Sequence, residues 1–326
     1  MNLNLYDENL ERVAVIGDRF ISCMWSEGYN AVQPFTLELQ ETDEYRKKIR
    51  PDFYIGRTDR KTLMVIKTVQ IKDGKITVSG KQATRVLKDV AFVGTINGGS
   101  VATEAIRTAY NGSSKFYNTE FASDDISDVY VEEIANKDFL ELCTTMCQSA
   151  DIGFRAVKNQ NKVMVKFYKP VANPNLIFSE DYGNLVLQSI TLSTENLKNY
   201  AIVLGEGDNE SQIRIDIDLT NGELRREMIV DAKSLRKEDG ETDEAYLARL
   251  RAHGMEKLLS QTRTWETSIL PVADDFGTRY DLGDILTIRL PQYGLQLQTR
   301  VSRFTQKSQN NKTTTTVEVG EITVTR

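Results

Sequence analysis

The sequence predicts an α+β fold that is mainly β, with two β-rich regions, a small α/β domain inserted between them and a further helical insertion. Three observations support this fold class. Apolar and polar side chains alternate along many short runs, such as Phe35–Leu39. Turn-forming pairs such as Asp73–Gly74 and Asn221–Gly222 separate these runs. Apolar residues at helical spacing are confined to a few stretches between them.

The first β-rich region, residues 1–95, is predicted to be a β-meander that closes into a small barrel. The pairs Glu27–Gly28 and Asp73–Gly74 lie between apolar runs, where hairpin turns need residues that tolerate positive φ. The predicted strands are Val13–Ile16, Phe20–Trp25, Ala31–Leu39, Thr62–Ile71 and Lys75–Gly80.

Residues 96–174 are predicted to form the inserted α/β domain. Its end is marked by Pro170 and Pro174, because proline removes a backbone donor and restricts the residue before it. The predicted helices are Val101–Tyr110 and Lys137–Ala150, and the predicted strands are Tyr130–Ile134, Gly153–Val157 and Lys162–Tyr168.

Residues 175–326 are predicted to form the second β-rich region, with a helical insertion at about 235–262. Thr242 suits the N-cap of that helix, and Asp243 and Glu244 suit its positive N-terminal end. The predicted strands are Leu185–Leu192, Asn199–Leu204, Gln212–Leu219, Glu223–Val230, Thr264–Ile269, Ile285–Leu290, Leu295–Phe304 and Thr314–Val324.

Composition excludes several classes of protein. A length of 326 residues exceeds the usual single domain, and 40% hydrophobic with 27% charged residues is ordinary for a soluble globular chain. No apolar run approaches the roughly 20 residues that a membrane span needs, and the N-terminus lacks the pattern of a secretory signal. A net charge of −6 argues against a face that neutralises many phosphates.

The sequence contains few residues that could bind a metal ion or take part in nucleophilic catalysis. Cys143 and Cys147 share one face of a predicted helix, and three cysteines are too few for a disulfide framework. The single histidine, His253, lies in mid-helix beside basic residues, where a solvated surface position explains it better than a catalytic triad. The sequence therefore predicts no metal, no cofactor and no catalytic residue of these kinds.

Paired carboxylates are the remaining candidates for catalysis. Asp216 and Asp218 alternate with Ile215, Ile217 and Leu219, so both should project from one face of a strand. Two carboxylates can hydrolyse a glycosidic bond without histidine. A half-solvated sheet face explains the same pattern more simply.

The order of motifs along almost the whole chain resembles that of phage tail-hub and baseplate-hub proteins. These include siphophage tail-tip hubs, Gp37-like prophage tail proteins and the N-terminal hub part of tail-associated lysins. The segments that carry the resemblance are Met24–Trp25 with Tyr29–Leu37, Phe178–Leu185, Asn199–Gly205, Arg225–Ala232, Tyr280–Ile288 and Gln298–Val301.

The resemblance implies a structural, non-enzymatic subunit of the virion tail, assembled in the cytoplasm of the bacterial host. It implies a homotrimer in which each subunit supplies two tube-like β-barrel domains, so that six barrels face a hexameric tail tube. The implied partners are the distal tail or tail tube protein, the tape-measure protein and a spike or receptor-binding tip component. DNA is implied only in transit, and no cofactor is implied.

Within this framework two groups of residues receive roles. Asp216 and Asp218 are hypothesised to line or approach a lumen, because acidic walls repel the phosphates of passing DNA. In the turn that starts the return to the second barrel, Gly283 is expected to permit the tight bend, and Leu282 to anchor it. Asp281 and Asp284 are expected to stay solvated. The alternatives are a tail-attached, carboxylate-dependent glycosidase or peptidoglycan hydrolase, and a carbohydrate-binding module.

Overall fold

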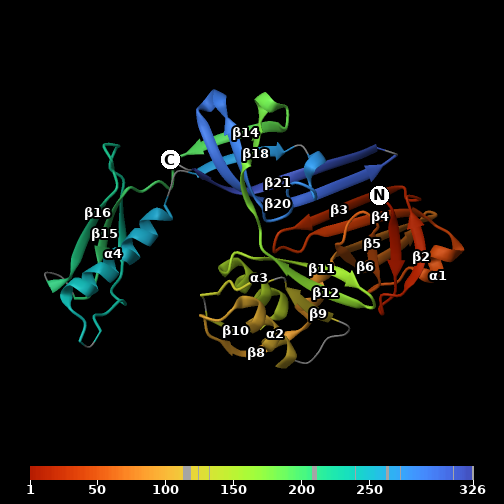
Figure 1. The fold of residues 1–326 in the computed structure, drawn as a ribbon, viewed down its shortest axis with the longest axis horizontal. Helices are drawn as coiled ribbons and strands as arrows, with labels where there is room; N and C mark the ends of the chain where they lie inside the picture. Colours follow the sequence, from red (N-terminus) through yellow and green to blue (C-terminus); the bar gives the residue numbers. More distant parts are fainter. Residues whose placement is uncertain are drawn as a thin grey trace. The chain divides into compact units, whose positions relative to one another are not determined.

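The structure is a computed structural model that describes residues 1–112, 119–123, 125–131, 133–207, 211–238, 240–261, 264–271, 273–310 and 312–324. The chain divides into two compact units (Figure 1). Unit 1 comprises Met1–Leu187 and Ile269–Arg326, and unit 2 comprises Gln188–Ser268. The fold is mainly β with a minority of helix, as the sequence predicts.

The largest sheet of unit 1 combines strands from both ends of the chain. Its order is β13-β19-β20-β3-β4-β7-β6-β5-β1-β2, and β21 also pairs with β20. Its strands are β1 (Leu3–Tyr6), β2 (Arg12–Gly17), β3 (Ser22–Gly28), β4 (Pro34–Gln40), β5 (Tyr54–Arg57), β6 (Leu63–Lys72), β7 (Lys75–Gln82), β13 (Ala172–Ser179), β19 (Ile285–Leu290), β20 (Leu295–Gln309) and β21 (Lys312–Val324). A short helix, α1 (Asp43–Lys48), lies between β4 and β5 in sequence.

The alternation of apolar residues predicted for Phe35–Leu39 is confirmed, and it turns the apolar side chains of this strand toward the core. Phe35, Leu37 and Leu39 are buried, whereas Thr36 between them is exposed. The hairpin turn predicted at Asp73–Gly74 is confirmed, because both residues have positive φ and join the paired strands β6 and β7.

The predicted closed barrels are not present in the described part of the chain. Strand β20 pairs with β19 through residues 295–300 and with β3 through residues 303–309. The C-terminal strands thus extend the N-terminal sheet. A barrel would require its end strands to pair with each other, whereas β2 pairs with β1 and β13 pairs with β19.

The α/β module of unit 1 contains both of its predicted helices (Figure 1). Helix α3 is capped by Asp138, whose Oδ1 accepts the backbone N–H of Glu141 at 2.9 Å. Cys143 and Cys147 lie on its buried face. The module comprises η1 (Ala83–Asp89), β8 (Ala91–Ile96), α2 (Ala102–Gly112), β9 (Thr119–Ser123), β10 (Ile134–Asp138), α3 (Phe139–Ser149), β11 (Gly153–Asn159) and β12 (Lys162–Tyr168).

One strand of this module lies at a different place from the one that the sequence predicts. The prediction at Tyr130–Ile134 is wrong, because the strand begins at Ile134 and continues to Asp138. Tyr130 instead has its ring fully buried among the module's apolar side chains, and its hydroxyl donates to the carbonyl of Asn97. In the sequence alone, a buried aromatic residue in a loop cannot be distinguished from a buried residue in a strand.

Unit 2 is a three-stranded sheet with one helix packed on it. The predicted helix is confirmed as α4 (Asp243–Leu259), with Thr242 Oγ1 accepting the N–H of Ala245 at 3.2 Å. Its core contains Ala201, Val203, Ile217, Val230 and Tyr246. The strands are β15 (Tyr200–Leu204), β16 (Arg214–Asp218) and β17 (Glu227–Asp231).

The strands on either side of Asn221–Gly222 do not form a hairpin. Both turn residues have positive φ, as predicted. However, β15 lies between β16 and β17, antiparallel to the first and parallel to the second. Two further strands, β14 (Leu185–Ser193) and β18 (Thr264–Pro271), form a separate two-stranded sheet. None of the helices in the described ranges is long and apolar enough to cross a bilayer.

Candidate functional site

The turn Tyr280–Asp284 is held by the carboxylate of Asp284. Its Oδ1 accepts the backbone N–H of Val171 at 2.7 Å, and its Oδ2 accepts that of Asp281 at 2.8 Å. The backbone carbonyl of Asp284 accepts the N–H of Val301 at 2.9 Å. This one residue therefore ties the turn to the segment that leaves the α/β module and to strand β20.

Gly283 occupies a position that no other residue type suits. Its φ is +88°, and a Cβ atom there would lie 2.4 Å from Cε2 of Tyr29. Only glycine adopts this conformation without strain and leaves space for the tyrosine ring. The neighbouring Leu282 is 2% exposed and lies in the interior of unit 1.

The two acids of the turn are half-buried and form direct contacts, whereas the sequence predicts that they stay solvated. Asp281 forms an ion pair of 2.8 Å with Arg155 on β11. The Arg155 guanidinium also lies 4.1 Å from the ring centre of Tyr168. Burial raises the pKa of Asp284 above its ordinary value. The backbone N–H of Val171 and the guanidinium of Arg155, both distant in sequence, replace water at these two acids.

Arg300 on β20 connects the same turn to the α/β module. Its Nη1 donates to the carbonyl of Gly283 at 2.8 Å, and its Nη2 donates to Oδ1 of Asp151 at 2.7 Å. The guanidinium carbon lies 5.1 Å from the ring centre of Tyr29. Arg300 thus contacts all three parts of unit 1: the N-terminal strands, the module and the C-terminal strands.

Asn30 makes the complementary connection from the N-terminal strands. It is 4% exposed, and its Nδ2 donates to the carbonyl of Ile152 at 2.8 Å. Its Oδ1 accepts the N–H of Phe154 at 3.1 Å. The side chain therefore pairs with the start of β11 as another strand would. We call the set Tyr29, Asn30, Asp151, Arg155, Asp281–Asp284 and Arg300 the junction.

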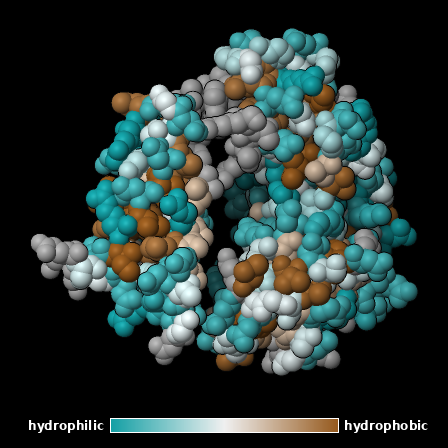
Figure 2. All heavy atoms as spheres, turned by 60° about the vertical axis from the view of Figure 1, so that its left-hand side comes forward, coloured by the Kyte–Doolittle hydropathy of each residue, from teal (hydrophilic) through white to brown (hydrophobic). Residues whose placement is uncertain are grey.

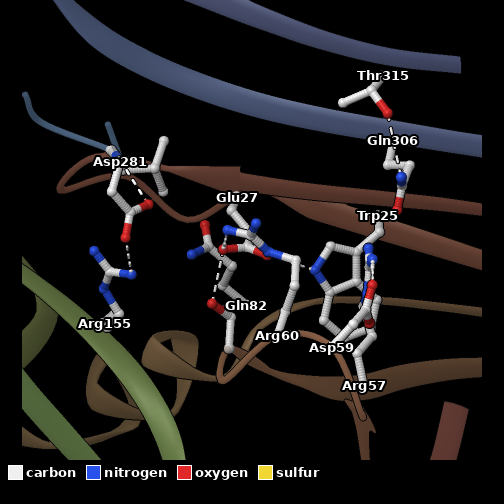
Figure 3. A network of polar contacts seen from close by, with 12 residues as sticks. Trp25, Glu27, Arg57, Asp59, Arg60, Gln82, Arg155, Asp281, Gln306 and Thr315 are labelled. Carbon is white, nitrogen blue, oxygen red and sulfur yellow. Dashed lines mark hydrogen bonds and ion pairs between the residues drawn. The ribbon is translucent and has the colours of Figure 1, made fainter. Parts of the chain in front are cut away.

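A buried ion pair lies beside the junction (Figure 3). The carboxylate of Glu27 on β3 pairs with the Arg60 guanidinium, which donates to it through Nε and Nη2. The carboxylate also accepts from Trp25 Nε1 at 2.8 Å and from Thr62 Oγ1 at 2.7 Å. Burial acts to raise the pKa of Glu27, but the Arg60 charge and these hydrogen bonds lower it below its ordinary value.

Arg60 also joins the N-terminal strands to the C-terminal segment. Its guanidinium carbon lies 4.3 Å from the ring centre of Phe304 and 4.8 Å from that of Phe276. The two rings stack on each other with centres 4.5 Å apart. The cation therefore has a carboxylate on one side and aromatic faces on the other.

The sequence does not indicate this network. It predicts Glu27–Gly28 as a hairpin turn, and this is wrong, since both residues belong to β3 and Glu27 is fully buried. The bend follows at Asn30, which has a φ of +48°. A glutamate before a glycine is typical of a turn, and its partner Arg60 is supplied by a different strand pair. The spacing of Trp25 and Glu27, two residues apart on one face of a strand, is the one weak sequence signal of the Nε1 hydrogen bond between them.

Asp216 and Asp218 lie in unit 2, on the exposed face of β16. Asp216 forms an ion pair of 2.9 Å with Arg214 and accepts from the Tyr200 hydroxyl at 2.8 Å. Asp218 accepts from the Thr220 hydroxyl at 2.7 Å. The hydrogen bonds from Arg214 and Tyr200 lower the pKa of Asp216.

The arrangement of these two acids does not support hydrolysis, because a general acid for glycoside cleavage needs a raised pKa. The pKa of Asp218 is likewise lowered, by its hydrogen bonds from Thr220. His253, the other candidate, is half-buried on α4.

Comparison with known proteins identifies the family. Residues 131–321, more than half of the 326 residues, match the family described as Siphovirus ReqiPepy6 Gp37-like protein. No curated protein sequence matches the chain.

Solved structures share the fold over nearly the whole chain. Prophage tail protein gp18 from Listeria monocytogenes EGD-e is 12% identical with a TM-score of 0.61, over 98% of this chain and 95% of that chain. The 43 kDa tail protein of prophage MuSo2 from Shewanella oneidensis is 11% identical with a TM-score of 0.58, over 98% of each chain. A tail protein from Neisseria meningitidis MC58 is 8% identical with a TM-score of 0.56, over 98% and 96%. The chain belongs to the Siphovirus ReqiPepy6 Gp37-like family and has the fold of prophage tail proteins, which confirms the resemblance visible in its sequence.

Proposed function

We propose that this chain is a structural hub subunit of a phage or phage-like tail tip or baseplate. Three copies form a ring that joins the hexameric tail tube to the tip and lets DNA or the tape-measure protein pass. Membership of a siphophage protein family supports this proposal most directly. The fold that the chain shares with prophage tail proteins along almost its whole length supports it further.

The open sheet of unit 1 is consistent with a subunit of a ring. Strand β2 is an edge of the described sheet and pairs there with β1 alone. An edge strand presents unpaired N–H and C=O groups that a neighbouring strand can complete. We therefore place the tube-forming segments at 1–95 and 175–326 and the inserted α/β domain at 96–174, with closure depending on neighbouring subunits.

The junction suits a subunit that transmits force rather than one that turns over a substrate. Its contacts are backbone pairing, ion pairs and ring packing between three segments of unit 1. The acids Asp216 and Asp218 have lowered pKa values and serve no general-acid role. These features support the non-catalytic role in the virion tail that we propose, with tube, tape-measure and tip or spike proteins as proposed partners.

The exposed face of β16, which carries Asp216 and Asp218, is proposed to line or approach the lumen. Asp216 and Asp218 project from that exposed face. Carboxylates repel DNA phosphates, so such a wall would favour passage over adhesion. A structure of the assembled ring with both carboxylates on its outer rim would remove this part of the proposal.

The oligomeric state tests the hub directly. Sedimentation of the purified chain, alone and with its tail tube protein, should yield a species of three times 36.9 kDa that binds the tube. Neighbouring rings can be required for assembly, so both conditions are measured. A chain that stays monomeric in both, and does not bind the tube protein, contradicts the proposal.

A further inference from the structure

A basic pocket of about 620 Å³ opens in unit 1 beside the junction. Seven of its eighteen lining residues are lysine or arginine, and two are aspartate. The whole chain, by contrast, has a net charge of −6. The pocket lining is therefore positively charged although the chain as a whole is negatively charged, and this favours an anionic ligand.

Several of these cations already have carboxylate partners, and two lysines have none among the described residues. Arg60 pairs with Glu27, Arg155 with Asp281 and Lys169 with Asp128. Lys61 is exposed and forms no ion pair among the described residues. Lys158 also has no carboxylate partner in that part of the chain; it donates to the carbonyl of Gln160 and lies 5.2 Å from the ring centre of Tyr6.

A buried guanidinium in the same wall lacks an acceptor. The Arg57 side chain is 2% exposed and pairs with Asp59 through Nη2 at 2.5 Å. Its Nη1 is buried and has no hydrogen-bond partner in the described structure. Buried donors are rarely left without an acceptor in folded proteins. Because this nitrogen is itself buried, Arg57 adds positive charge to the wall, and the lysines are left to contact a ligand.

The pocket is not purely polar. Leu63, Val157 and Leu282 contribute apolar wall, and each is almost fully buried. A ligand that matches both surfaces carries carboxylates together with an apolar side chain. On the face drawn in Figure 2 hydrophobic residues occur in separate groups among hydrophilic ones.

The same features argue against nucleic acid. Single strands bind along an extended basic groove with aromatic rings free for base stacking. Here the volume is that of a compact site, and Lys158 and Arg155 already cover the rings of Tyr6 and Tyr168.

We propose that this pocket binds a short acidic segment of a partner polypeptide, with carboxylates at Lys61 and Lys158 and an apolar side chain against Leu63 and Val157. Its position beside the junction means that an occupied pocket would brace the module against the N-terminal strands. This proposal does not depend on trimer formation, because the binding test uses the isolated chain.

The probe is a fluorescent peptide of alternating glutamate and leucine, titrated with the full chain and followed by anisotropy. It should bind, and added salt should weaken binding, because the charges are screened. A peptide with glutamine in place of glutamate should bind about tenfold or more weakly. Absence of binding by the glutamate peptide, or equal binding of both peptides, overturns the proposal.

Charge reversal locates the site. The double variant Lys61→Glu with Lys158→Glu should weaken binding about tenfold or more, whereas Lys81→Glu, an exposed lysine outside the pocket, should leave it unchanged. Thermal unfolding of each variant checks that the chain is folded. Equal effects of the two variants reject this pocket. An unlabelled oligonucleotide that displaces the peptide at similar concentrations reassigns the site to phosphate and rejects the peptide.

Discussion

At the residue scale, backbone geometry and side-chain space act together at Gly283. Its φ of +88° is unfavourable for other residues, and the Tyr29 ring occupies the space of a Cβ. Gly283→Ala should lower the free energy of unfolding by about 2–3 kcal/mol, from backbone strain plus a clash within packed surroundings. Urea unfolding measures the loss.

Gly294→Ala is the matched control for this substitution. Gly294 has a φ of +62°, and no atom lies within 4 Å of its ideal Cβ position. It should lose only about 1 kcal/mol, the cost of the left-handed conformation. Equal losses at the two positions would show that contact with Tyr29 contributes nothing.

Glu27 holds a buried charge in unit 1 that is paired with Arg60. Glu27→Gln leaves the Arg60 guanidinium, whose side chain is 14% exposed, without an ionic partner among the described residues. We expect a loss of about 2–4 kcal/mol in the free energy of unfolding, because one member of a buried pair is removed. Glu38→Gln, which removes a solvent-exposed pair with Lys75, should cost clearly less. A Glu27 loss no larger than the Glu38 loss contradicts this assignment.

The lowered pKa of Glu27 also predicts a pH dependence. Because the folded pKa lies below the ordinary value of 4.5, the unfolded chain takes up the proton first. The carboxylate therefore contributes stability above that value, and the contribution is lost as pH falls through the folded pKa. The difference in unfolding free energy between wild type and Glu27→Gln should shrink between about pH 7 and about pH 3. A difference independent of pH would assign the effect to shape rather than charge.

At the element scale, the sequence predicts what depends on local spacing. Both α/β-module helices, α4 with its Thr242 cap, and the Asp73–Gly74 hairpin are visible as short-range patterns. The pairing of β20 with β3 joins residues separated by most of the chain, and no local pattern encodes it. The same reason hides the junction, because Asn30 contacts Ile152 and Phe154, which lie 122 and 124 residues away in sequence.

Helix α4 contains a glycine that packing requires against helix propensity. A Cβ at Gly254 would lie 2.3 Å from Cγ2 of Val203 and 2.9 Å from Cδ1 of Ile217. Alanine gains about 1 kcal/mol in an open helix, but overpacking costs about 1–3 kcal/mol. Gly254→Ala should therefore destabilise unit 2, and Ala248→Gly, exposed on the same helix, measures the propensity term alone. An increase in the melting temperature of Gly254→Ala would contradict close packing of α4 on β15.

At the scale of the whole molecule, the division into two compact units has a measurable consequence. Each unit has its own hydrophobic core: Trp25 and Phe35 belong to a cluster in unit 1, and Val203 and Tyr246 belong to the cluster of unit 2. Separate cores allow separate cooperative unfolding. Calorimetry should therefore resolve two transitions.

The two glycine variants assign these transitions. Trp265→Phe leaves Trp25, which is fully buried in unit 1, as the chain's one tryptophan, so its fluorescence follows unit 1. In that background Gly283→Ala should lower the transition that fluorescence detects, and Gly254→Ala should lower only the other one. This follows because the residues of each clash belong to a single unit. One transition that both variants shift equally would mean that the two units unfold as a single cooperative body.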